Sequence, residues 1–191
     1  MQEKHIENIV EKYVRANSTI AIGTGKLGEQ FLKKLALKAV ADGIKVHYIP
    51  ASANMAAIAS SLHLPIASLN EKTVDLAIEF VDVVDGDFNF IKRHSSSLIR
   101  DKMIAQSAEL LITITQMKNF GKLQGRIPFE IASFGYKHTL AQLDSFGKTS
   151  LRLENGKPFK TETNNYLAEV LIDKLHNLED IDYSAKQIPG V

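Results

Sequence analysis

The chain has no cysteine among its 191 residues. This absence excludes disulfide bonds, thiolate metal sites and cysteine nucleophiles, and it is typical of a protein kept in a reducing compartment. Apolar runs of the roughly 20 residues that a membrane span needs are also missing. The charged, amphipathic start MQEKHIENIV lacks the apolar core of a signal peptide. We therefore expect a cytoplasmic protein that does not enter a membrane.

An excess of charge of one sign is missing as well. The formal net charge is only +1, so no bulk field draws the protein toward nucleic acid, and nucleic-acid binding is not expected. A metal site is not expected either, because the six histidines show no H-x-x-x-H pair or other ligand spacing. The residues that are present, 45% hydrophobic and 24% charged, are typical of a globular protein with one or two domains.

Strand-like and helix-like patterns alternate through the first part of the chain. Apolar strand patterns cover 18–22, 45–49, 66–69, 74–78 and 110–115, and helical spacing covers 3–16, 27–41, 54–62 and 97–107. Strands that alternate with helices pair in parallel. The pattern therefore predicts an α/β fold with a doubly wound, mostly parallel, Rossmann-like sheet, in a first domain of residues 1–126.

The rhythm of the pattern changes after Arg126. Strand patterns follow at 129–133, 149–154 and 158–163, the last extended by further apolar strand content at 166–171, and helix patterns at 137–146 and 181–187. Asn155-Gly156 predicts a hairpin turn between the second and third of these strands. This β-α-β-β-α order is most of a ferredoxin-like unit. Residues 127–191 are therefore predicted to form a second, smaller, incomplete α+β domain of ferredoxin-like type.

The stretch 74–105 concentrates groups that can move protons. An apolar strand pattern leads into Glu79 and Asp82, a lone Lys92 follows, and a later helix pattern opens with Asp101. Ligands bind at the carboxyl ends of strands in open α/β sheets, and carboxylates beside a lysine can transfer protons without a metal or cofactor. The alternative is that Glu79, Asp82 and Lys92 are solvated loop charges and that Asp101 is an acid favoured by the helix dipole.

The segment from Gly23 to Gly28, GTGKLG, matches G-x-G-x-x-G between a strand and a helix. A dinucleotide site is disfavoured, because the second strand ends in IPAS without the acid that binds a ribose. We interpret Gly23, Thr24, Gly25 and Lys26 as a phosphate loop, in which backbone N–H groups and a helix N-terminus face an anion. A plain strand-to-helix turn is the alternative. Ser52, in the next loop, could contact a ligand, cap the following helix, or do both.

At these residues the chain resembles the A-type ribose-5-phosphate isomerases, over nearly its full length. The matching segments are Ile22-Gly23-Thr24-Gly25, Ile49-Pro50-Ala51-Ser52, Glu79 through Ser97, Leu98-Ile99-Arg100-Asp101-Lys102, Ile127-Pro128-Phe129-Glu130, Thr161-Glu162-Thr163-Asn164-Asn165 and Ile188-Pro189-Gly190-Val191. The central block and the order of its motifs are specific to that family.

The resemblance implies a cofactor-free interconversion of ribose 5-phosphate and ribulose 5-phosphate through an enediolate. It implies that Asp101, at the position of the family's glutamate base, moves the proton, and that Glu79, Asp82 and Lys92 assist ring opening and handle the charge on oxygen. The phosphate is then expected among residues 23–26, Ser52 and Lys118. The sheet edge left by the missing final strand is expected to be covered by a partner subunit, in a homodimer or homotetramer.

The chain departs from the family pattern at its proposed site. Asp101 replaces a glutamate and Glu79 an aspartate. Each exchange moves a carboxylate by roughly 1.5 Å, and a misplacement of about 1 Å can cost a hundredfold in rate. Arg93 and the HSSS that follows it replace a glycine run, so side chains stand where glycine would allow close substrate approach.

Two alternatives therefore stay open beside the isomerase. The first is a catalytically impaired paralogue that binds a phosphosugar or regulates another protein. The second is a different enzyme on the same scaffold, such as a CoA transferase or an amino-sugar isomerase. A CoA transferase needs a nucleophilic glutamate, and the glycine context expected around it is absent at Glu79, which is followed by Phe80-Val81.

Overall fold

The computed structural model describes residues 3–172 and 178–191. The chain divides into a first unit, Met1–Phe80 with Ile99–Ile114, and a second unit, Val81–Leu98 with Thr115–Val191. Residues 81–98 and 115–126 thus group with the C-terminal elements in this division. The domain boundary predicted between residues 126 and 127 stays a prediction. In the described residues no helix is both long enough and apolar enough to cross a membrane.

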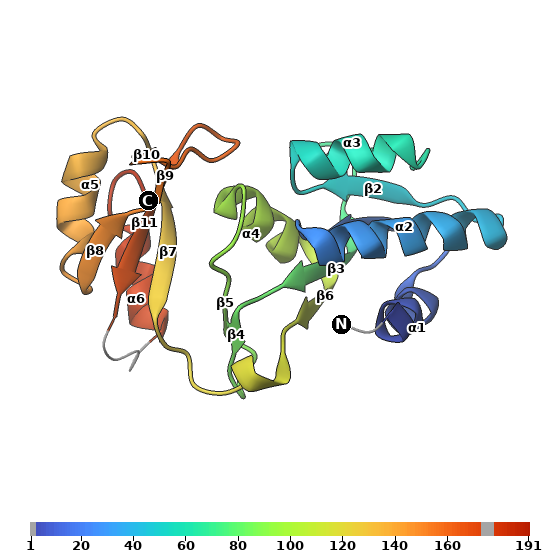
Figure 1. The fold of residues 1–191 in the computed structure, drawn as a ribbon, viewed down its shortest axis with the longest axis horizontal. Coiled ribbons are helices and arrows are strands. Elements are labelled where there is room, and N and C mark those ends of the chain that lie inside the picture. The colour runs from blue at the N-terminus through green and yellow to red at the C-terminus, as the bar shows by residue number, and fades with distance from the viewer. Residues whose placement is uncertain (1–2, 173–177) are drawn as a thin grey trace. The chain divides into compact units, whose positions relative to one another are not determined.

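A four-stranded parallel sheet forms the centre of the first unit (Figure 1). Its strands are β1 (Thr19–Ile22), β2 (His47–Pro50), β3 (Val74–Phe80) and β6 (Ala108–Ile114), in the order β2-β1-β3-β6. All three pairings are parallel, and Ala21 of β1 lies opposite Ala77 of β3. The predicted doubly wound parallel sheet is therefore confirmed.

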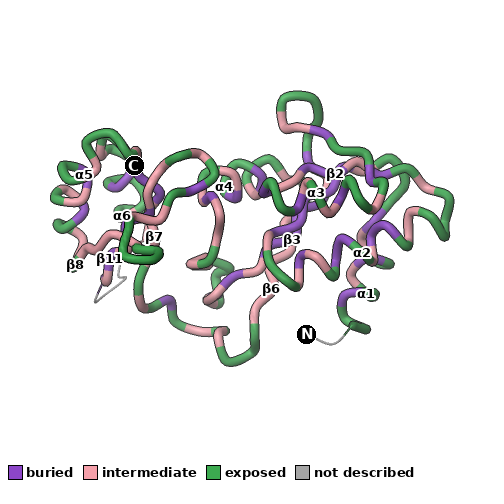
Figure 2. The backbone as a smooth tube through the Cα atoms, turned by 45° about the horizontal axis from the view of Figure 1, so that its top comes forward, coloured by how far each residue is buried: buried purple, intermediate pink, exposed green. Residues whose placement is uncertain are grey.

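Both faces of this sheet are covered by helices, as parallel sheets require. One face packs with α1 (Glu3–Tyr13), α2 (Lys26–Ala41) and α3 (Ala53–Ser61) in a cluster that includes Ile20, Tyr48 and Ile78. The other face, with Ala21 and Ala77, packs with Ile104 of α4 (Leu98–Ser107). Figure 2 shows that buried residues run along β3, and that they alternate with exposed residues along α2.

The strand order reverses between β1 and β3. From β1 the chain passes through α2 to β2 on one side, whereas from β3 it passes through α4 to β6 on the other. The carboxyl ends of β1 and β3 therefore lie at a topological switch point, the place where open α/β sheets bind ligands. The residues at this edge are those that follow β1, beginning with Gly23, and those at the end of β3.

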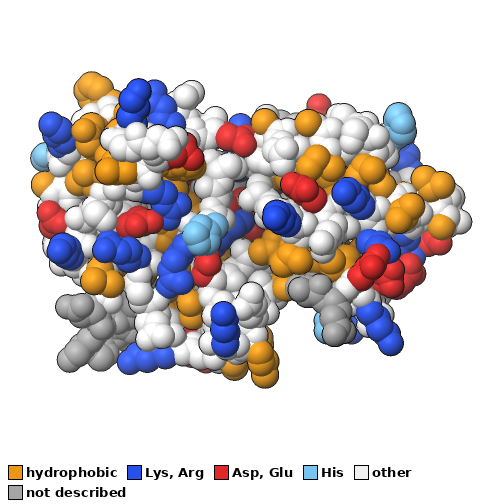
Figure 3. All heavy atoms as spheres, in the orientation of Figure 1, with side chains coloured by type: hydrophobic (Ala, Val, Ile, Leu, Met, Phe, Trp, Pro, Cys, Tyr) orange, Lys and Arg blue, Asp and Glu red, His pale blue; other side chains and the backbone are white. Residues whose placement is uncertain are grey.

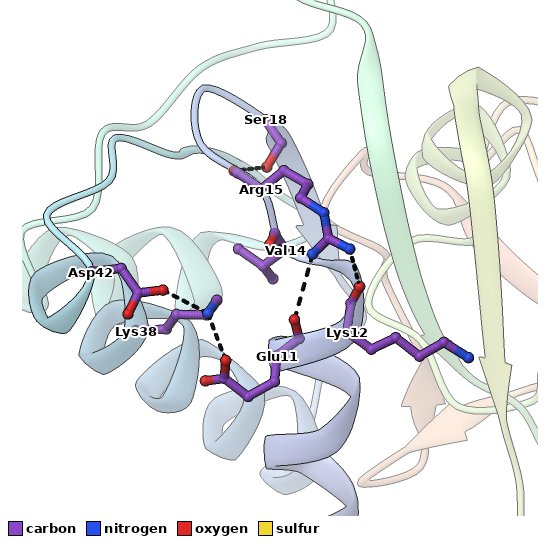
Figure 4. A network of polar contacts seen from close by, with 7 residues as sticks. All are labelled: Glu11, Lys12, Val14, Arg15, Ser18, Lys38 and Asp42. Carbon is purple, nitrogen blue, oxygen red and sulfur yellow. Dashed lines mark hydrogen bonds and ion pairs between the residues drawn. The ribbon is translucent and has the colours of Figure 1, made fainter.

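Charged side chains of both signs lie side by side on the surface where α1 and α2 meet (Figure 3). The Lys38 ammonium lies 2.7 Å from Glu11 Oε2 and 2.6 Å from Asp42 Oδ2 (Figure 4). Beneath these pairs, Ile6 and Val10 are buried against α2. Since exposed ion pairs contribute little, this apolar contact is what holds α1 against α2.

The second unit contains an antiparallel sheet with the order β7-β11-β8. Its elements are β7 (Arg126–Ile131), α5 (Tyr136–Leu143), β8 (Lys148–Leu151), β11 (Tyr166–Leu171) and α6 (Leu178–Lys186). The third strand lies between the first and the second, which is the arrangement of the first three strands in a ferredoxin-like unit. The predicted smaller α+β region is therefore confirmed.

Two short hairpins and a 3₁₀ turn also belong to the described part of the second unit. β4 (Val83–Val84) pairs with β5 (Phe90–Ile91), and β9 (Leu153–Glu154) pairs with β10 (Lys157–Pro158); a 3₁₀ turn, η1, covers Met117–Asn119. Asn155 and Gly156 join β9 to β10 with φ of 51° and 74°, the left-handed pair that a tight hairpin turn needs. The predicted hairpin turn is confirmed.

Two strand predictions were wrong in extent, and one hairpin was missed. The pattern at 66–69 forms only an isolated bridge between Ile66 and Tyr48, because the chain passes the sheet edge without forming a ladder. The pattern at 158–163 reduces to β10 and a single bridge between Lys160 and Tyr166. No strand was predicted across the β4–β5 hairpin, since two-residue strands carry no readable alternation.

Candidate active site

Three glycines, in the turn after β1 and in the first residues of α2, have different structural roles. Gly23 continues the sheet, and its N–H donates to the Ile78 carbonyl at 2.8 Å. Gly25, with φ of 99°, precedes the first residue of α2 in a conformation that L side chains rarely adopt. A Cβ on Gly28 would lie 1.9 Å from the Gly23 carbonyl oxygen. The third glycine of the G-x-G-x-x-G pattern therefore allows α2 to pack onto the turn, which requires no dinucleotide.

Glu79 lies at the carboxyl end of β3, directly beside this turn. Its side chain is 2% exposed, and continuation of the β1–β3 register places Glu79 opposite Gly23. A Cβ on Gly23 would come within 2.7 Å of the Glu79 Oε2 atom. The absence of a side chain at Gly23 is thus what leaves room for the carboxylate.

Tyr48 lies close enough to Glu79 for the carboxylate to affect the pKa of its phenol. Its ring is fully buried in β2, and its hydroxyl donates to the Ile22 carbonyl at 3.3 Å, one residue before the glycine turn. Burial raises the pKa of the Tyr48 phenol, and the nearby Glu79 carboxylate raises it further. The phenol therefore stays protonated and remains a donor at the end of β1. Nothing in the sequence distinguished Tyr48 from an ordinary core tyrosine.

Asp101 lies on the side of the sheet that Glu79 faces. It occupies the first turn of α4, is 5% exposed, and lies one helical turn before Ile104, which packs in the cluster of Ala77. Because side chains alternate along a strand, Glu79 points to the same face as Ala77. The first unit thus brings two buried carboxylates to one face at the carboxyl edge of its sheet.

The β4–β5 hairpin of the second unit brings Asp82 and Lys92 together. Val83 pairs with Ile91, so the next pair in this register is Asp82 with Lys92. The Asp82 carboxylate accepts a hydrogen bond from the Arg93 backbone N–H at 2.6 Å, and its other oxygen lies 3.9 Å from His94 Nε2. Lys92 is partly buried. An acid and an amine are therefore neighbours in this register, whereas the sequence predicted no hairpin between them.

The phosphate-binding candidates fall in both units. In the first, Thr24 is partly buried and Lys26 is exposed as the first residue of α2. Ser52 is buried and its Oγ accepts from the Met55 N–H at 3.2 Å, so the capping role holds. In the second, Lys118 is exposed on η1 and lines a small pocket with Asn119 and Lys122. Phosphate contacts at these residues stay predictions.

The Arg93–Ser97 segment, which stands where the family has glycines, is fastened by its own side chains. The Arg93 guanidinium donates to the carbonyl of Arg126 at 2.9 Å and to that of Gln124 at 2.5 Å. The Arg93 side chain is therefore held against residues 124–126, and the expectation that side chains of this segment occupy substrate space stays a prediction. His94 is exposed.

Glu130 of β7 is a buried carboxylate to which sequence reasoning gave no role. It accepts hydrogen bonds from the hydroxyls of Ser97, Thr161 and Thr163 and from the Asn165 amide. The signal available in the sequence was a glutamate inside an apolar strand pattern, RIPFEI. Such a residue is costly to bury unless its oxygens are satisfied.

A comparison with protein families identifies the family of this chain. The family model of ribose 5-phosphate isomerase A (phosphoriboisomerase A) matches residues 47–191. The chain belongs to the ribose-5-phosphate isomerase A family. This membership confirms the resemblance read from the motifs at Gly23, Glu79–Ser97 and Asp101.

Relatives and solved structures agree with the ribose-5-phosphate isomerase A assignment. The chain is 32% identical to ribose-5-phosphate isomerase A of Bacillus mycoides, over 94% of this chain and 83% of the relative. It is also 32% identical to ribose-5-phosphate isomerase A 2 of Oceanobacillus iheyensis, over 94% and 82%. Ribose 5-phosphate isomerase from Plasmodium falciparum superposes with a TM-score of 0.91 at 27% identity, covering 99% of this chain and 86% of that one.

One further solved structure supports the fold and supplies a ligand. A D-ribose-5-phosphate isomerase in complex with phospho-erythronic acid has a TM-score of 0.87 and 24% identity, over 100% of this chain and 89% of that chain. At this identity the likeness shows the fold alone. The phospho-erythronic acid belongs to that protein, and it offers a probe with which binding by this family member can be measured.

Proposed function

We propose that this chain interconverts ribose 5-phosphate and ribulose 5-phosphate by moving a proton between C1 and C2. The observation that supports the proposal most strongly is the pair of buried carboxylates, Glu79 and Asp101, on one face of the sheet at its switch point. Family membership favours this reaction over a binding or regulatory paralogue. The coarser statement, that the chain is a member of an isomerase family, does not depend on the roles assigned below.

In the proposed mechanism Asp101 is the base. It takes the proton from C2 of the open-chain aldose while the electron pair of that C–H bond forms the C1–C2 double bond of an enediolate. The carbonyl oxygen at C1 gains the negative charge and then takes up a proton, in exchange for the one that the C2 hydroxyl gives up, so that the number of protons is unchanged. Asp101 returns its proton to C1 as the C2 oxygen becomes the ketone. A buried carboxylate suits this exchange, because it has little water to compete for the proton.

Asp82 and Lys92 handle the oxygens in this proposal. Enediolate charge is stabilised best by a cation or donor that is already in place when the charge develops. The β4–β5 register makes Lys92 the neighbour of Asp82. The hairpin backbone therefore fixes the place from which the Lys92 side chain extends, and the Asp82 carboxylate provides a negative charge beside it. Glu79 assists ring opening by accepting the proton of the C1 hydroxyl as the bond between C1 and the ring oxygen breaks, while the ring oxygen takes up a proton in exchange.

The substrate phosphate is proposed to bind at the glycine turn. The N-terminus of α2 presents unpaired N–H groups and a partial positive charge, and Lys26 adds a full charge as the first helical residue. Thr24, Ser52 and Lys118 are the further candidates. A homodimer or homotetramer and a cytoplasmic location remain predictions of the same proposal.

Turnover and binding measured together test the function. Conversion of ribose 5-phosphate is followed by proton NMR, and binding of phospho-erythronic acid is followed by calorimetry on the same preparation. The proposal predicts both conversion and binding. Binding without conversion selects the impaired paralogue, and the absence of both overturns the proposal. Conversion of another aldose phosphate in place of ribose 5-phosphate would keep the reaction type and change the substrate.

A further inference from the structure

Glu130 accepts hydrogen bonds from four side chains although it is only 7% exposed. Its Oε1 atom accepts from Thr161 Oγ1 at 2.8 Å, from Asn165 Nδ2 at 3.1 Å and from the Thr163 hydroxyl. Its Oε2 atom accepts from Ser97 Oγ at 3.3 Å. All of these residues belong to the second unit. The carboxylate therefore joins β7, the 161–165 turn and the segment that ends at Ser97.

The contacts around Ser97 extend this junction to the backbone. The Glu162 N–H donates to the Ser96 carbonyl at 2.9 Å, so main chain meets main chain beside the carboxylate. The Ser97 N–H donates to Ser95 Oγ at 2.9 Å. At the other end of the segment, Arg93 is held by the carbonyls of residues 124 and 126. Residues 93–97 are thus fastened at both ends, in a chain that lacks the family's glycines there.

The chemistry of the junction calls for a carboxylate. Ser97, Thr161, Thr163 and Asn165 each present a donor, and two carboxylate oxygens offer about four acceptor positions. A glutamine of the same shape would turn one acceptor into an N–H₂ donor directed at hydroxyl groups. Burying an acid is unfavourable unless such donors compensate it. Glu130→Gln should therefore disorder the segment 93–97 while it changes the packed volume very little.

We propose that Glu130 is a positioning residue for the isomerisation: through Ser97 and the 161–165 turn it fixes the segment that joins Lys92 to the first turn of α4. This inference rests on the proposed function, because the segment is bounded by the proposed ammonium group and by the helix that carries Asp101. Glu130 acts through the Ser97 loop and is assigned no contact with the substrate. A residue that only stabilised the sheet would not need a bond to Ser97.

The test compares Glu130→Gln with Glu154→Gln, a matched exchange on the exposed β9 strand. We measure kcat and KM with ribose 5-phosphate, the thermal midpoint, and amide hydrogen exchange of peptides covering 93–98 and β11. A misplacement approaching 1 Å costs about a hundredfold in rate, so Glu130→Gln should lower kcat by roughly 10- to 100-fold. Exchange at 93–98 should rise while β11 stays protected. Glu154→Gln should change neither quantity.

Two results would overturn the proposal. One is a kcat within twofold of wild type in folded Glu130→Gln, and the other is exchange that rises in β11 as much as at 93–98, which marks a purely structural role. Should Glu130→Gln not fold, Ser97→Ala removes the bond to Oε2, together with the 3.4 Å contact between Ser97 Oγ and Thr163 Oγ1, and keeps the Glu130 carboxylate. It should give the same effects in smaller measure. Wild-type protein without turnover would overturn the proposed function instead, while the exchange data still decide whether Glu130 holds the loop.

Discussion

Replacing Gly23 by alanine would place a methyl group against the Glu79 carboxylate. The new Cβ would lie 2.7 Å from Oε2, 3.3 Å from Phe80 Cδ2 and 3.4 Å from Glu79 Cδ. Ordinary contacts of this kind begin at 3.4 Å, so the carboxylate oxygen must move by about 0.7 Å. The atom that moves is the end of a side chain, and the expected loss of stability is therefore near the lower limit for overpacking, about 1 kcal/mol.

The same displacement should affect turnover far more than folding. Since a misplacement of about 1 Å costs a hundredfold in rate, a shift of about 0.7 Å in an assisting carboxylate predicts a fall in kcat of roughly 10- to 50-fold. The assay is the NMR conversion of ribose 5-phosphate, paired with urea unfolding of each variant. Gly86→Ala is the control, because a Cβ there meets nothing within 4 Å. Unchanged kcat in Gly23→Ala would refute the placement of Glu79 in the reaction.

Two further predictions concern the fold and its pH dependence. Gly28→Ala should destabilise the protein by about 3 kcal/mol or more, since its Cβ would lie 1.9 Å from a backbone oxygen that cannot swing aside; a urea midpoint equal to that of wild type would show that α2 does not pack on the turn as described. Burial, followed by the charges of Lys72 and Lys45, lowers the pKa of His47 from its usual 6.5. The unfolded chain then binds the proton more readily, so stability is fully present above pH 6.5 and is lost as the pH falls through the lowered folded value. When the pH is lowered from above to below 6.5, the thermal midpoint should therefore fall less in His47→Gln than in wild type. An equal fall in the two proteins would contradict the assignment.

Features of this fold that depend on local pattern could be predicted. β1, α2 and β3 follow from apolar runs and helical spacing separated by glycine, and the Asn155-Gly156 turn follows from the φ > 0 that only such residues adopt readily. The position of Glu79 at the carboxyl end of β3 was predicted for the same reason, since polar residues at the end of an apolar strand mark the edge where ligands bind; its role stays a prediction. The Ser52 cap is equally local, because it bonds to a residue three positions along.

What could not be predicted depends on contacts between distant segments. The reason for glycine at position 23 is the side chain of Glu79, far along the chain, and no local signal reports such a contact. The pairing of Asp82 with Lys92 needs a hairpin with two-residue strands, too short to show alternation. Glu130 meets Ser97 across 33 residues. The sequence shows that an arginine replaces a glycine at position 93, but only the structure shows that its side chain donates to the carbonyls of residues 124 and 126.

Incorporation of solvent deuterium at C2 of ribose 5-phosphate tests most directly whether a carboxylate of α4 moves the substrate proton. In deuterated water the wild-type protein should exchange the C2 hydrogen, detected by NMR. Asp101→Asn, which keeps the shape of the side chain but removes the base, should bind phospho-erythronic acid and exchange at least a hundredfold more slowly, about the factor that a general base contributes. Exchange at the wild-type rate in folded Asp101→Asn would contradict the account.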